Sequence, residues 1–101
     1  MTSLSPRTCA LIDRMFQPED RLVVRTRLER ECDATTLHLT AASPDQLERY
    51  WFAVLRLSGG NLGALDHPLS LARLDYRDLL MAAGFGEDLE AHNRWWNANA
   101  C

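Results

Sequence analysis

At 101 residues, the chain has about the size of one folded domain and is too short for two. Its 47% hydrophobic and 25% charged residues exclude an intrinsically disordered chain, which combines low apolar content with a strong charge imbalance. A net charge of −3 argues against a nucleic-acid-binding domain, which concentrates basic residues on one face. We therefore expect a single helical domain over residues 1–101.

The cysteines and the apolar runs indicate the compartment. Cys9, Cys32 and Cys101 are widely spaced and include no C-x-x-C pair, which predicts free thiols in a reducing environment. The N-terminus lacks the apolar stretch of a signal peptide, and the longest apolar run, residues 50–55, is far short of the ~20 residues that span a bilayer. We expect a cytoplasmic protein that does not bind to a membrane.

Two helices are expected in the first third of the chain. Ser5 followed by Pro6 predicts a helix start, and this helix ends before Pro18, which begins the second one. In the second helix, the residues expected to be buried are Val24, Leu28 and Cys32, with Leu22 or Val23. Oppositely charged residues four apart are expected to pair on its wet face, as Arg25 with Glu29 and Arg27 with Glu31.

The segment 20–40 is harder to assign. β-branched residues at positions 23, 24 and 26 resist helix slightly, and residues 35–40 alternate polar and apolar side chains as a strand does. A lone strand finds no evident partner in this sequence, so a loop is the expectation for 35–40. Helix, loop and short strand all remain open for the segment as a whole.

The clearest helix of the sequence starts at Ser43. Ser43 and Gln46 have the spacing of a capping box, the helix extends through Leu57, and the Gly59-Gly60 pair ends it. At about 100° per residue, one stripe about 160° wide contains Leu47, Tyr50, Trp51, Val54, Leu55 and Leu57. Phe52 falls about 60° outside this stripe. We expect a central helix with Phe52 at the margin of its buried face.

The remaining helices are short. Asn61 is expected to cap a short helix through Leu62 and Leu65, which Pro68 interrupts and His67-Pro68 restarts. Asp75 is expected to cap another that ends at Gly84, and Glu87 and Asp88 to open the last one. Residues 97–101 are expected to fray. The predicted fold is all-α, a compact irregular bundle of about five short helices.

No pattern of catalytic, metal-binding or cofactor-binding residues emerges, so no such site is assigned. His38, His67 and His92 lack metal-ligand spacing with other ligand residues, and the glycine-rich residues 58–63 lack the lysine of a phosphate-binding loop. Asp88 and His92 lie four apart on the predicted last helix. Together with Tyr76, they form the candidate site of an alternative hypothesis, a small-ligand-binding or enzymatic protein.

The adjacent aromatic residues support the leading hypothesis. Neighbouring residues of a helix point about 100° apart, so Tyr50, Phe52, Trp95 and Trp96 cannot all enter one thin core from one side. Exposed aromatic side chains are typical of protein interfaces. We therefore expect a non-catalytic helical module that binds a protein partner or a second copy of itself through these four residues. The opposing interpretation is that neighbouring helices flank the central helix on two sides and that Trp95 lies flat over the end of the bundle.

A second alternative is a nucleic-acid accessory protein. It requires several arginines to converge on one face, namely Arg7, Arg14, Arg25 and Arg27.

Residues 52–60 and 76–85, with Ala91-His92, resemble a family of small, uncharacterised bacterial proteins of proteobacterial type. The likeness covers about half of the chain. It implies a bacterial, cytoplasmic source and assigns no catalytic residue and no mechanism.

Overall fold

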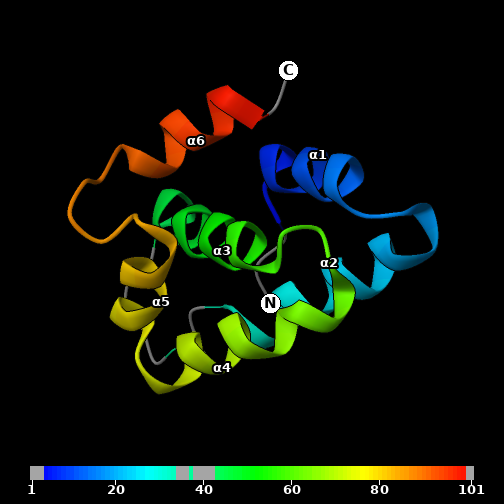
Figure 1. The fold of residues 1–101 in the computed structure, drawn as a ribbon, viewed down its shortest axis with the longest axis horizontal. Coiled ribbons are helices and arrows are strands. Elements are labelled where there is room, and N and C mark those ends of the chain that lie inside the picture. The colour runs from blue at the N-terminus through cyan, green and yellow to red at the C-terminus, as the bar shows by residue number, and fades with distance from the viewer. Residues whose placement is uncertain (1–3, 34–36, 38–42, 100–101) are drawn as a thin grey trace.

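Helices account for every regular element that the structure shows. The computed structural model describes residues 4–33, 37 and 43–99, and within these it has six α-helices, one 3-10 helix and no strand (Figure 1). In chain order they are α1 (Pro6–Met15), α2 (Pro18–Glu31), α3 (Pro44–Ser58), the 3-10 helix η1 (Leu62–Leu65), α4 (Asp66–Leu74), α5 (Tyr76–Ala83) and α6 (Ala91–Asn99). The all-α prediction is confirmed, with one α-helix more than the five expected. None of the described helices combines the length and the apolar character that crossing a bilayer requires.

The predicted caps bound the helices. Ser5 Oγ accepts a hydrogen bond from the Thr8 amide at 3.2 Å at the start of α1. At the start of α3, Ser43 Oγ accepts from the Gln46 amide at 3.2 Å, and Gln46 Oε1 accepts from the Ser43 amide at 3.0 Å. Gly59 ends α3 at a φ of 59°, a left-handed conformation that glycine adopts without strain. The capping box predicted for the central helix is therefore confirmed.

The helix predicted to restart at His67-Pro68 is α4, which begins at Asp66 and includes Pro68, because the first amides of a helix have no partner within it. Two boundaries predicted near the end of the chain are wrong. The last helix begins at Ala91 instead of Glu87, because Asp88 Oδ1 accepts a hydrogen bond from the Glu90 amide at 2.8 Å and holds a turn there. α6 then continues to Asn99, so residues 97–99 are helical where a frayed end was expected.

α2 is helical despite its β-branched residues. Its expected core residues Val24, Leu28 and Cys32 are buried, whereas Leu22 and Val23 are exposed.

The ion pairs of α2 follow the prediction in part. Arg27 pairs with Glu31 as predicted, with Nε 2.8 Å from Oε2, but Arg25 pairs instead with Asp13 of α1 at 2.9 Å. Of the segment expected to be a loop, residues 35, 36 and 38–40 lie outside the described residues, and Leu37 is buried.

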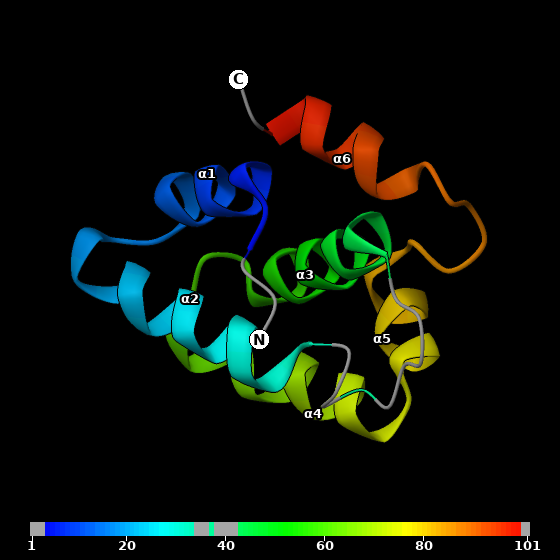
Figure 2. The same ribbon diagram turned by 180° about the vertical axis from the view of Figure 1, so that it is seen from behind.

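The central position expected for α3 is confirmed. In both views α1 and α6 lie on one side of α3, α2 and α4 lie on the other, and α5 crosses one end (Figures 1 and 2). α3 packs against α1, α4, α5, α6 and η1. Helices on two sides bury both faces of α3, so Phe52 is fully buried with 0% exposure. The expectation that Phe52 lies at the margin of the buried face is wrong, because it allowed for only one buried stripe.

Candidate functional site

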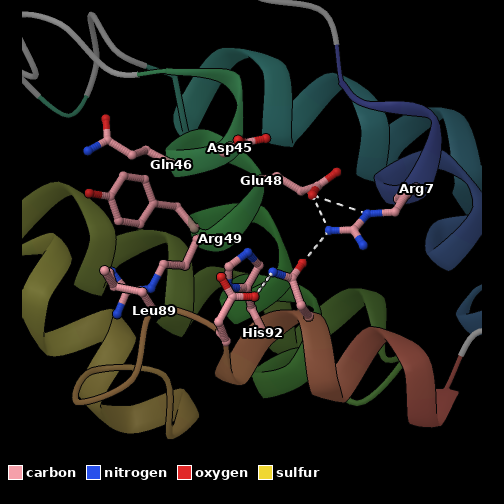
Figure 3. Close-up of a pocket in the computed structure, with 10 residues that line it drawn as sticks. Arg7, Asp45, Gln46, Glu48, Arg49, Leu89 and His92 are labelled. Carbon is pink, nitrogen blue, oxygen red and sulfur yellow. Dashed lines mark hydrogen bonds and ion pairs between the residues drawn. The ribbon is translucent and has the colours of Figure 1, made fainter.

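A pocket of about 300 Å³ lies where the first two turns of α3 face the starts of α1 and α6 (Figure 3). This volume is at the lower end of the range for small-molecule sites. Its lining combines charged, amide and aromatic side chains from three helices and the segment before α6: Arg7, Asp45, Gln46, Glu48, Arg49, Tyr50, Leu89, Glu90, His92 and Asn93.

An ion pair between Arg7 and Glu48 forms one wall of the pocket. Arg7 Nε donates to Glu48 Oε1 at 3.2 Å, Arg7 Nη2 pairs with the same oxygen, and Ser5 Oγ donates to Oε2 at 2.5 Å. Burial alone would raise the pKa of Glu48. The hydrogen bonds from Arg7 and Ser5, with the positive charge of Arg7, outweigh that effect and hold the pKa below its usual range. Glu48 is therefore a charged carboxylate whose interactions within the protein are satisfied.

The guanidinium of Arg7 joins three helices at this wall. Besides Glu48 of α3, it donates from Nη2 to Asn93 Oδ1 of α6 at 2.6 Å. It lies over the rings of Phe52 and Trp96, 5.3 and 5.2 Å from their centroids. Such cation–π contacts add to the ion pair where water is excluded. Three of the five N–H donors of Arg7, on Nε and Nη2, are thus used inside the protein.

Arg49 is placed differently. Its side chain extends from α3 toward Leu89 (Figure 3), and its Nη2 donates to the backbone carbonyl oxygen of Phe85. Its Nε is buried and has no hydrogen-bond partner among the described residues. No carboxylate among the described residues forms an ion pair with Arg49. A half-buried guanidinium with a buried, unpaired N–H group therefore lines the pocket.

His92 brings a second buried nitrogen to the pocket. The side chain is 6% exposed, and its ring packs against Phe52 and Phe85 with centroids 5.8 and 6.3 Å apart. Nδ1 has no hydrogen-bond partner among the described residues. Burial lowers the pKa of His92, and the positive charges of Arg49 and Arg7 lower it further, against the opposite effect of Glu48 and Glu90. His92 is therefore neutral at pH 7.

These two nitrogens define what the pocket can do chemically. A buried polar atom left without a partner costs about 1–3 kcal/mol, so a ligand that pairs with it recovers stability that the protein alone lacks. Arg49 Nε can only donate a hydrogen bond, whereas a neutral imidazole nitrogen donates or accepts according to its tautomer. The pocket is thus suited to a small polar molecule that carries a hydrogen-bond acceptor.

The aromatic residues expected at a protein interface are more buried than that hypothesis requires. Tyr50 lines the pocket at 6% exposure, and Phe52 lies in the core behind it. Trp95 and Trp96 are half-buried, and both pack on Phe52, Trp95 edge-on at 5.9 Å and Trp96 stacked at 6.0 Å. The expected exterior position of Phe52 is wrong, whereas Trp95 and Trp96 keep part of their surface accessible.

The structure does not bring Tyr76, Asp88 and His92 together as one site. His92 lines the pocket, but Asp88 pairs with Arg94 and holds the turn before α6. Tyr76 is not part of the lining, although its ring packs against that of Tyr50, which is, with centroids 5.5 Å apart. The proposed grouping of Asp88 with His92 is wrong because α6 begins at Ala91, so the two do not share a helix face.

The sequence analysis placed none of the five charged residues of the lining at a small-ligand site: Arg7, Asp45, Glu48, Arg49 and Glu90. A signal for one of them was present: at about 100° per residue, Glu48 falls between Leu55 and Phe52 on the wheel of α3. A carboxylate in that position needs a cationic partner. Nothing local identifies the partner as Arg7, which lies 41 residues away.

The arginines of the nucleic-acid hypothesis are largely engaged with acidic side chains. Arg7 is held by Glu48, Arg25 by Asp13, and Arg27 by Glu31 and Asp66. Arg14 also has an interaction within the protein. Among the described residues, no group of three or more histidine, cysteine or acidic side chains is arranged to hold a metal ion.

Comparisons with protein family models, with curated proteins and with solved structures find no match for this chain. The assignment of a function therefore starts from the geometry of the pocket.

Proposed function

We propose that this protein binds a small polar ligand in the pocket between α1, α3 and α6. The observation that carries the proposal is a pair of buried nitrogens, Arg49 Nε and His92 Nδ1, which have no partners among the described residues and belong to two side chains that line one pocket. Buried polar groups in folded proteins are paired in the great majority of cases. Two exceptions at one pocket are best explained by a molecule that binds there.

The surroundings of the two nitrogens support a preformed site. His92 is held between aromatic rings, and the wall next to it is fixed by the ion pair of Arg7 with Glu48. Side chains that are locked in this way lose little freedom when a ligand binds. Binding without a catalytic step is the simplest activity of such a pocket.

Nuclear magnetic resonance of the ¹⁵N-labelled chain tests the proposal directly. The probes are propionate, propionamide and inorganic phosphate, each titrated at constant ionic strength. We expect at least one probe to shift the Arg49 Nε–H signal and the His92 ring signals saturably, at millimolar concentrations typical of so small a molecule. Titrations in which all three probes leave both signals unmoved would overturn the proposal.

A variant pair locates the binding. His92→Phe preserves a ring between Phe52 and Phe85 but removes Nδ1. We expect it to weaken the active probe by about three- to tenfold, the effect of one lost hydrogen bond. His67→Phe, at an exposed position of α4, is the matched control and should leave the affinity unchanged. Equal affinities in the two variants would place the probe elsewhere and contradict the proposal.

A second candidate function is contact with a protein partner, which includes a second copy of this chain. It is favoured by the half-buried Trp95 and Trp96 on α6 and by Leu89, 72% exposed in the segment before it. Light scattering over a tenfold dilution series tests self-association, with Trp95→Ala as the variant. A mass that stays monomeric in both proteins would remove the homodimer, and a dimer that Trp95→Ala leaves intact would remove this surface.

A further inference from the structure

We infer that the ligand of this pocket carries a single carboxylate group, which Arg49 binds. The inference rests on the proposed function and deepens it, because it names the chemical class of the ligand. It depends on the balance of charges around the pocket and on which of them are already paired.

The two cations of the lining differ in what they have left to offer. Arg7 forms an ion pair with Glu48 and donates to Asn93. Among the described residues, Arg49 makes one hydrogen bond, to the backbone oxygen of Phe85, and no carboxylate forms an ion pair with it. A compensating charge is that of Asp88, whose pKa Arg49 helps to lower but which forms its ion pair with Arg94. A ligand that enters the pocket can therefore form an ion pair with Arg49, whereas Arg7 already forms one with Glu48.

The unpaired atom of Arg49 is a donor that calls for an anionic acceptor. Its Nε–H is buried, and hydrogen bonds between a guanidinium and a carboxylate are about twice as strong as those between neutral groups. A planar carboxylate also matches the planar guanidinium, which holds it better than a point charge would. A neutral amide of the same shape accepts a hydrogen bond but leaves the charge of Arg49 without a counter-ion.

The remaining charges limit the ligand to one negative charge. Asp45, Glu48 and Glu90 also line the pocket, and of these only Glu48 is compensated by an arginine in the lining. His92 is neutral at pH 7 and adds no positive charge. A doubly charged phosphate would meet two uncompensated carboxylates for one available cation. A monocarboxylate can pair with Arg49 as well, and its single charge is repelled less by Asp45 and Glu90.

Competition between isosteric probes tests this inference. Propionate and propionamide have the same shape and differ in charge, so each is titrated against the intact chain at pH 7 and constant ionic strength. We expect propionate to bind about tenfold more tightly than propionamide and more tightly than inorganic phosphate. Equal affinities for propionate and propionamide, or tighter binding of phosphate, would overturn the carboxylate while leaving the pocket as a binding site. Failure of all three would overturn the proposed function itself.

Variants of Arg49 assign the preference to this residue. Arg49→Gln should bring the propionate affinity down to that of propionamide. The control Arg73→Gln makes the same change on α4, which lies on the side of α3 away from α1 and α6, and should preserve the tenfold preference (Figure 1). Arg49→Lys retains the charge without Nε, and we expect it to keep part of the preference. It also covers the case in which Arg49→Gln fails to fold. A preference that survives in both Arg49 variants would contradict the inference.

Discussion

Arg7 and Glu48 join the first helix to the central helix across 41 positions of sequence, through an ion pair whose carboxylate is almost entirely buried. The same carboxylate accepts from Ser5 Oγ, the side chain that also caps α1. The start of α1, the first turns of α3 and one wall of the pocket are therefore held by one set of contacts.

Replacement of the buried carboxylate should destabilise the fold. We expect Glu48→Gln to lower the free energy of unfolding by about 1–3 kcal/mol, because it leaves Arg7 without its counter-charge in a partly buried position. Asp13→Asn, which alters the exposed pair with Arg25, is the matched control and should cost less than about 1 kcal/mol. Urea denaturation at pH 7 measures both. Equal costs in the two variants would contradict the special role of Glu48.

Glu48 also predicts a loss of stability at acid pH. The pKa of Glu48 is lowered in the folded chain, so the unfolded chain binds a proton more readily. The stabilisation is complete above the unfolded value of about 4.3 and is lost as the pH falls through the folded value. In Glu48→Gln this contribution to acid unfolding should disappear, so the two proteins should converge in stability at low pH. A difference in unfolding free energy between the two proteins that stays constant down to pH 2 would disprove this role of Glu48.

His92 predicts a second pH effect in a higher range. Burial and the nearby arginines lower its pKa below the unfolded value of about 6.5. The unfolded chain therefore takes up the proton first, and the free energy of unfolding should decline as the pH drops from 7 towards 5. His92→Gln should flatten this decline, whereas His67→Gln should retain it. Denaturant midpoints measured at intervals across this range provide the test.

Cys32 should resist chemical modification in the folded chain. Burial raises the pKa of its thiol to about 12, with a further contribution from the negative charges of Asp33 and Glu31. Only the thiolate is nucleophilic, so iodoacetamide at pH 8 should alkylate the half-buried Cys9 well before Cys32. Mass spectrometry of peptides cleaved at arginine separates the two sites. Modification of Cys32 at the rate seen in denaturant would show that α2 is not packed as described.

Two adjacent glycines after α3 provide a matched test of packing. Both have positive φ, so alanine costs about 1–2 kcal/mol at either position. At Gly59 a Cβ atom would meet nothing within 4 Å, but at Gly60 it would lie 2.6 Å from the backbone oxygen of Met15. We expect Gly60→Ala to cost about 1–3 kcal/mol more than Gly59→Ala. Equal thermal stabilities would contradict the close approach of this turn to α1.

The sequence predicted those parts of the fold that depend on neighbouring residues. Ser43 and Gln46 lie three apart and form their capping box by local contacts alone, and Gly59 ends the same helix because of its own conformational freedom. Phe52 shows the limit of this reasoning. Its burial depends on where α1 and α6 pack, and a helical wheel of α3 contains no information about helices elsewhere in the chain.

The candidate site could not be predicted from the sequence for the same reason. His92 was a candidate, but its true neighbours come from distant segments: Glu48 and Arg49 lie more than 40 positions earlier in the chain. Arg49 is placed by a hydrogen bond to the backbone oxygen of Phe85, 36 residues away. A backbone acceptor leaves no trace in side-chain identity, so spacing rules cannot find it.

α6 supplies one wall of the pocket and packs on α3 mainly through side chains, with His92 and Trp96 against Phe52 and Asn93 bonded to Arg7. Local opening of α6 would therefore dismantle the pocket while the caps and packing of α3 persist. A ligand that touches both helices binds only the closed form, and at ten times its dissociation constant it reduces the open population about tenfold. Hydrogen exchange of the α6 amides would then slow by the same factor, so the kinetics of one helix would report occupancy of the site.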